Sequence, residues 1–149
     1  MKKKQFKITI NASVEKVFAD MLGTETYKKW TSVFNPTSNF EGTWGKNEKI
    51  IFLGTNKEGK KEGMIGIIRE YEPNKYVSIE YTGLLDGDKE ITSGKEVESW
   101  IGSHENYSYE SNGDQTVVTV DLDVAEPFLE YFEETFPRAL EKLKEVSES

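Results

Sequence analysis

The segment Glu126–Val146, EPFLEYFEETFPRALEKLKEV, decides how the rest of the chain can fold. At about 100° per residue its apolar side chains fall within an arc of roughly 120°, and charged side chains cover much of the remainder. Pro127 suits the first helical position, where its missing N–H has no partner, and this makes Glu126 the expected cap. The pattern predicts one long amphipathic helix. Its apolar stripe needs a broad apolar surface to lie on, because it carries three phenylalanines, Phe128, Phe132 and Phe136.

The preceding chain supplies that surface as a series of strands. Phe6, Ile8 and Ile10 alternate with polar residues, which is typical of a half-buried strand. Further alternating runs are separated by hairpin-type turns, so the sheet is expected to be antiparallel with about six or seven strands. The segment Gly83–Ser99 contains three glycines and little periodicity, and it predicts a long loop that is functional or mobile.

Two short helices are expected directly after the first strand. Val14–Leu22 has apolar residues at helical spacing, and Ser13 is placed to cap it. Gly23 ends this helix, and Thr24 can cap a second short helix that runs through Lys29 or Trp30. The predicted fold class is therefore α+β, with a curved antiparallel sheet wrapped around the C-terminal helix. Residues 1–149 are expected to form a single domain.

Composition excludes several classes of function. The formal net charge of −8 argues against binding to nucleic acid or to anionic lipid. The absence of cysteine excludes disulfides, thiol nucleophiles and zinc–thiolate sites. No apolar run approaches the ~20 residues of a membrane helix, so we expect no membrane span and a cytoplasmic protein. No spacing of acidic residues or of the single histidine resembles a metal site, and we expect neither metal nor cofactor.

Several stretches resemble a known family. Ile8–Phe18, Trp30, Phe40–Gly45 and Ile68–Val77 are similar to motifs of the START-like helix-grip superfamily (SRPBCC, the birch-pollen-allergen fold). Within it, the likeness is to the branch related to the activator of the ninety-kilodalton heat-shock-protein ATPase. The resemblance implies a helix-grip fold with an apolar cavity between the sheet and the long helix. Known relatives bind lipids or hormones, cyclise polyketides or stimulate a chaperone ATPase, and the fold alone does not choose among these.

The aromatic side chains are the best candidates for the lining of such a cavity, although ordinary core packing would also account for many of them. His104 is the only histidine and a candidate polar group beside them, either as a ligand contact or as a general acid or base. The candidate ligand-binding residues are Trp30, Phe34, Phe52, Tyr81, Trp100, His104, Tyr107, Phe128, Phe132 and Phe136.

Three functions follow from this pattern, in order of preference. The first is non-enzymatic binding of a small apolar or amphipathic molecule between the sheet and the C-terminal helix. The second is a protein-interaction module, a regulator of a chaperone ATPase by resemblance. The third is an enzyme of the cyclase or aldol type, with His104 as base and Tyr81 or Tyr107 orienting a carbonyl. Either a monomer or a homodimer is compatible with the sequence.

Overall fold

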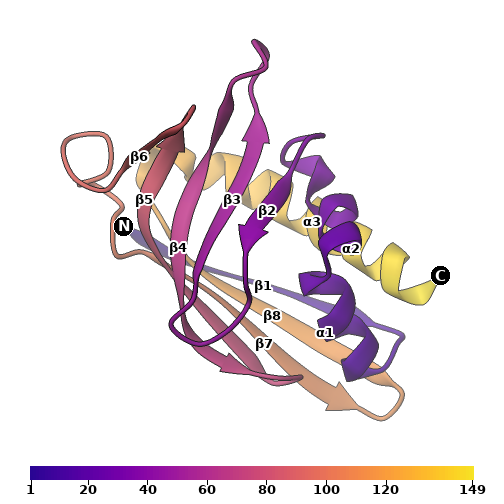
Figure 1. The fold of residues 1–149 in the computed structure, drawn as a ribbon. Coiled ribbons are helices and arrows are strands. Elements are labelled where there is room, and N and C mark those ends of the chain that lie inside the picture. The colour runs from indigo at the N-terminus through magenta and orange to yellow at the C-terminus, as the bar shows by residue number, and fades with distance from the viewer.

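Eight strands form one antiparallel sheet in the computed structural model, which describes all 149 residues (Figure 1). The strands are β1 (Lys2–Ile10), β2 (Asn39–Gly42), β3 (Lys49–Thr55), β4 (Lys61–Glu72), β5 (Tyr76–Asp86), β6 (Lys89–Ile91), β7 (His104–Asn112) and β8 (Gln115–Val124). The helices are α1 (Val14–Leu22), α2 (Thr24–Trp30) and α3 (Leu129–Glu148), with short 3-10 turns at Thr31–Val33 and Glu126–Phe128. The strand order is β1-β8-β7-β5-β4-β3-β2, and β6 pairs with β5 outside this path.

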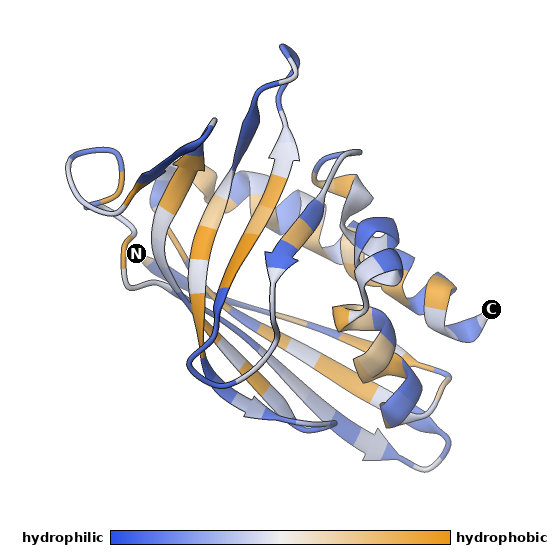
Figure 2. Cartoon of the chain, viewed as in Figure 1, coloured by the Kyte–Doolittle hydropathy of each residue, from blue (hydrophilic) through white to orange (hydrophobic).

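The helices lie on the concave side of the sheet. Figure 1 shows α3 crossing the sheet, with α1 and α2 beside it between the two ends of the strand order. Figure 2 shows apolar and polar residues alternating along the strands, as a sheet with one buried face requires. The predicted α+β helix-grip arrangement is therefore confirmed, with one more strand than the sequence indicated.

Both short helices are confirmed, but Thr24 is the first residue of α2 rather than its cap, and Gly23 stands at the cap position. The backbone N–H of Lys16 donates to the Ser13 hydroxyl oxygen at 3.2 Å, so Ser13 caps α1 as expected. The long helix is also confirmed, but its beginning differs from the prediction. Glu126–Phe128 form a 3-10 turn preceded by Ala125, and the α-helix starts only at Leu129. Glu126 is therefore not the cap, because Pro127 stands in this tighter turn rather than in α3.

The cap on α1 gives a direct test of local stability. Ser13→Ala is expected to lower the free energy of unfolding by about 1 kcal/mol, because the Lys16 N–H loses its side-chain partner. Urea denaturation followed by circular dichroism measures the change. Ser13→Asp is the control, since its carboxylate can accept the same hydrogen bond, and it should retain most of the stability. Equal losses in both variants would show that the cap contributes nothing.

The predicted loop Gly83–Ser99 is wrong over its first half. Strand β5 continues through Gly83 to Asp86, and β6 pairs with it. A glycine is needed at position 83 because the backbone of Ile91 lies close to it. A Cβ on Gly83 would lie 2.5 Å from the Ile91 carbonyl oxygen. The second half is irregular but anchored, since Val97 is fully buried.

The core lies between α1, α2 and α3 and the concave face of the sheet. Trp30 is 1% exposed, and its indole N–H donates to the Met21 carbonyl oxygen at 2.9 Å. Phe136 of α3 is 2% exposed and stacks on Phe6 of β1 with ring centroids 5.3 Å apart. None of the helices is long and apolar enough to cross a membrane.

Candidate functional site

A carboxyl group on the concave face is the most unusual polar feature of the molecule. Along β7, the side chains of Glu105, Tyr107 and Tyr109 share the face on which Tyr107 and Tyr109 are buried. The Tyr81 hydroxyl, from the neighbouring strand β5, donates to Oε1 of Glu105 at 3.0 Å. The Tyr107 hydroxyl donates to Oε2. We call these three residues the acid–phenol cluster.

Burial dominates the electrostatics of the acid–phenol cluster. It raises the pKa of the Glu105 carboxyl, and the hydrogen bonds from Tyr107 and Tyr81 offset only part of that rise. Burial also raises the pKa of both phenols, and the nearby Glu105 charge raises it further. The pKa of Tyr27 of α2 is raised for the same two reasons. The tyrosines therefore stay neutral hydrogen-bond donors at physiological pH.

An aromatic wall adjoins the acid–phenol cluster. Phe52 of β3 has its ring centroid 6.1 Å from that of Tyr81 and 6.1 Å from that of Tyr27. Trp44 lies 5.6 Å from Phe52, and its buried indole N–H has no hydrogen-bond partner. Phe52, Tyr81 and Glu105 are only half-buried, although all lie on the concave side. Part of the concave face is therefore accessible to solvent.

Helix α3 contributes a second aromatic group near its beginning. Phe34 packs against Phe136 at 5.2 Å and against Phe132 at 6.3 Å between ring centroids. Phe34 and Phe132 are half-buried, whereas Tyr131 beside them is 45% exposed. The predicted residues Phe34, Phe132 and Phe136 therefore do come together.

The structure separates the remaining predicted site residues. Trp30 belongs to the core, where it contacts α1. Trp100 precedes β7 and donates its indole N–H to the Glu96 carbonyl oxygen at 3.0 Å. Phe128 is 54% exposed at the turn before α3. Of the ten predicted residues, those associated with the acid–phenol cluster are Phe52, Tyr81 and Tyr107.

His104 lies on the opposite, convex face of the sheet. Its side chain is 40% exposed, and Nδ1 stands 3.9 Å from the Asp123 carboxylate. It also lines a shallow pocket of about 300 Å³ together with Lys3 and Asp121. A constellation of His104 as base with Tyr81 or Tyr107 is therefore not assembled, because the sheet stands between them.

Sequence reasoning missed Glu105 and Tyr27. Glu105 is not among the predicted site residues, because a glutamate in a strand is usually exposed to solvent. One signal was available, because Glu105 is two residues from Tyr107 and therefore shares its face. No comparable signal marked Tyr27, whose approach depends on how α2 packs against the sheet.

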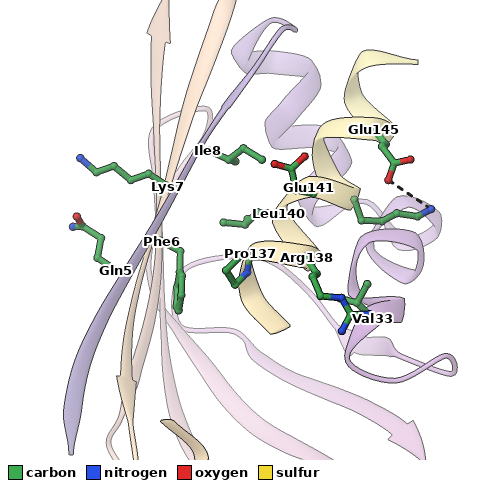
Figure 3. Close-up of a pocket in the computed structure, with 11 residues that line it drawn as sticks. Gln5, Phe6, Lys7, Ile8, Val33, Pro137, Arg138, Leu140, Glu141 and Glu145 are labelled. Atoms are coloured by element: carbon green, nitrogen blue, oxygen red, sulfur yellow. Dashed lines mark ion pairs between the residues drawn. The ribbon is translucent and has the colours of Figure 1, made fainter. Parts of the chain in front are cut away.

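An apolar-lined groove lies elsewhere, between β1 and α3 (Figure 3). It is open, has a volume of about 610 Å³, and carries Lys7 and Arg138 among its lining residues. Figure 3 shows Ile8 and Leu140 pointing toward one another across it. The lining of this groove includes none of the ten predicted site residues. The cavity expected between the concave face and the long helix stays a prediction.

Comparisons with known proteins bear on the fold. No protein-family model matches the chain, and no curated protein matches it. Among solved structures, an Aha1 dimer from Colwellia psychrerythraea is similar over 99% of this chain and 96% of that one, at 21% identity and TM-score 0.72. The chain has an Aha1-like helix-grip fold. A protein from Arthrobacter aurescens is similar over 98% of this chain and 86% of that one, at 17% identity and TM-score 0.74. One from Mesorhizobium loti is similar over 97% and 96%, at 11% identity and TM-score 0.73.

The acid–phenol cluster predicts an unusual dependence of stability on pH. A carboxyl with a raised folded-state pKa contributes fully to stability below its unfolded pKa, and this contribution is lost as pH rises through the folded pKa. Glu105→Gln keeps the shape without the charge. We therefore expect it to be more stable than the parent at pH 8, by roughly 1 kcal/mol, and to lose this advantage near pH 4.

Urea unfolding midpoints measured from pH 4 to pH 8 test this expectation. The matched control is Glu110→Gln, which removes the same charge from an exposed position on the same strand. It should show no comparable gain at high pH. A Glu105→Gln protein that is less stable than the parent at pH 8 would mean that the ionised carboxyl stabilises the fold.

Proposed function

We propose that this protein binds a small amphipathic molecule on the concave face of its sheet, beside α3. The acid–phenol cluster would hold the polar end of that molecule, and Phe52 would contact its apolar part. The observation that carries the proposal is the half-buried Glu105 carboxyl, whose hydrogen-bond donors are the phenols of the half-buried Tyr81 and the buried Tyr107. Sites for small molecules combine apolar walls with a few convergent polar groups in this way.

The energetics support a role beyond packing. Burying a carboxyl group is unfavourable unless its hydrogen bonds are satisfied, and an apolar residue at this position would avoid that cost. The orphaned N–H of Trp44 adds a second unfavourable group to the same aromatic wall. A bound polar molecule would give the Glu105 carboxyl a further hydrogen-bond partner.

Fluorescence titration with a neutral apolar probe, N-phenyl-1-naphthylamine, tests the proposal. We expect saturable binding to the parent protein and binding about tenfold weaker or worse to Phe52→Ala, because an aromatic contact is lost. The control is Ile51→Ala, since adjacent strand residues face opposite sides and Ile51 therefore lies on the convex face. Circular dichroism verifies that both variants fold. Absence of saturable binding by the parent, or equal losses in both variants, would contradict the proposal.

Regulation of a chaperone ATPase is the second candidate, supported by a different surface. Phe128 and Tyr131 are 54% and 45% exposed where α3 begins, and exposed aromatic side chains are common in protein interfaces. The similarity to an Aha1 structure adds to this candidate. Stimulation of a purified ninety-kilodalton chaperone ATPase by the parent, but not by a Phe128→Ser/Tyr131→Ser variant, is the expected result. No stimulation by the parent would remove the candidate.

The sheet edges and one of the similar solved structures also bear on whether this protein forms a homodimer. Strands β1 and β2 end the strand order, so each leaves one edge without a neighbouring strand. One similar structure is an Aha1 dimer, which supports self-association here. Sedimentation velocity over a range of protein concentrations decides between a monomer and a dimer.

A further inference from the structure

We infer that the polar end of the bound molecule is an organic cation, an amine or a quaternary ammonium group, and that Glu105 is its counter-ion. The inference rests on the proposed binding function and specifies the ligand class for the same site. It depends on three observations: the absence of a cationic partner for Glu105, the unused acceptor capacity of its carboxylate, and the series of aromatic rings that adjoins Tyr81.

The chain itself supplies no cation to Glu105. Twelve ion pairs are present, and none of them involves this residue. Its immediate partners are the hydroxyls of Tyr81 and Tyr107, which are neutral donors. A half-buried carboxylate without a counter-charge is costly, and carboxylates removed from water are ordinarily paired. A cationic ligand would provide the missing partner.

The carboxylate also has room for further hydrogen bonds. An ionised carboxylate offers about four lone-pair sites, and one phenol bonds to each oxygen of Glu105. Each oxygen therefore keeps one free acceptor position. The two phenols hold the carboxyl in place, so an ammonium group would meet acceptors that are already oriented.

The surrounding rings suit a positive charge as well. Tyr27, Phe52 and Tyr81 form a continuous series with centroid separations of 6.1 Å between neighbours. The negative faces of such rings attract ammonium groups, most strongly where water is excluded. An anionic head group would instead meet the Glu105 charge in a protein of net charge −8. The chemistry of this face thus favours a cation over an anion of the same shape.

Three probes with the same apolar part separate these alternatives: 4-phenylbutylamine, 4-phenylbutanol and 4-phenylbutyrate. We expect isothermal titration calorimetry at pH 8 to show the amine binding to the parent about tenfold more tightly than the alcohol, with the carboxylate weakest. Glu105→Gln should abolish the preference for the amine, so that the amine and the alcohol bind this variant with similar affinity. Glu110→Gln, which removes a charge from an exposed site on the same strand, should leave all three affinities unchanged.

The outcomes distinguish this inference from the proposed function. If the alcohol or the carboxylate binds as tightly as the amine, or if Glu105→Gln keeps the preference for the amine, the face binds amphipathic molecules but not cations specifically. If Glu110→Gln lowers the affinity for the amine as much as Glu105→Gln does, the effect comes from the net charge of the protein and the inference fails. If none of the three probes binds the parent, both the inference and the proposed function are overturned.

Discussion

Trp30→Ala is expected to destabilise the protein by about 3–5 kcal/mol, which is the usual cost of removing a large aromatic side chain from a core. Trp30 is 1% exposed and joins α2 to α1 through its hydrogen bond to the Met21 carbonyl oxygen. It also packs edge-on against Tyr27 at 5.6 Å between ring centroids. Urea denaturation monitored by circular dichroism measures the loss, and it should appear as a lower midpoint with an unchanged slope.

Trp30→Phe separates the hydrogen bond from the packing. Phenylalanine keeps most of the apolar contact but leaves the Met21 carbonyl oxygen without its partner, so a smaller loss of about 1–3 kcal/mol is expected. If Trp30→Ala costs no more than Trp30→Phe, then packing around this side chain contributes little and the description of the core is wrong.

Phe136→Ala should have an effect of similar size, about 3–5 kcal/mol, because it removes the largest buried side chain that α3 packs against the sheet. Phe136 is 2% exposed, stacks on Phe6 of β1 and meets Phe34 edge-on. The expected measurement is again the free energy of unfolding in urea. Retention of the parent's stability would show that α3 is held to the sheet by other contacts.

The matched control for Phe136→Ala is Phe128→Ala. The same side chain is removed close to the same helix, but from a position that is 54% exposed. Surface substitutions usually change stability by no more than about 0.5 kcal/mol. Comparable losses of stability in the two variants would mean that burial does not determine how much each phenylalanine contributes to the free energy of unfolding.

The fold could be predicted from the sequence because its local signals agree. Val14–Leu22 has helical periodicity and a capping serine, and the structure contains both the helix and the cap. The stripe of Glu126–Val146 predicted the long helix, although its first turn proved to be 3-10. Gly83 was misread, because a glycine that permits close backbone approach cannot be told from a loop glycine without knowing its neighbours.

The candidate site was only partly predictable, because it depends on contacts between distant strands. Tyr81 and Tyr107 were both named, yet their common partner Glu105 was not, since a carboxyl in a strand is usually exposed. His104 was grouped with Tyr107 although the two are three residues apart in one strand. Side chains alternate along a strand, so residues three apart lie on opposite faces. The sequence alone therefore predicts that His104 and Tyr107 do not share a face.

The acid–phenol cluster also shows why the fold does not specify the ligand. Helix-grip proteins share the sheet and the long helix, but the chemistry of the concave face depends on single side chains. In this chain that face carries Glu105, which has two neutral donors and no cationic partner. Under the proposed function, a substitution of Glu105 would change what the face binds and leave the architecture intact.

Mapping a bound probe by nuclear magnetic resonance tests the central claim most directly. A titration of isotopically labelled protein with 4-phenylbutanol reports on every backbone amide at once. We predict saturable shifts around Phe52, Tyr81 and Glu105 on the concave face. Shifts confined to the β1–α3 groove, at residues such as Ile8 and Leu140, would contradict the claim and assign the binding site to the groove instead.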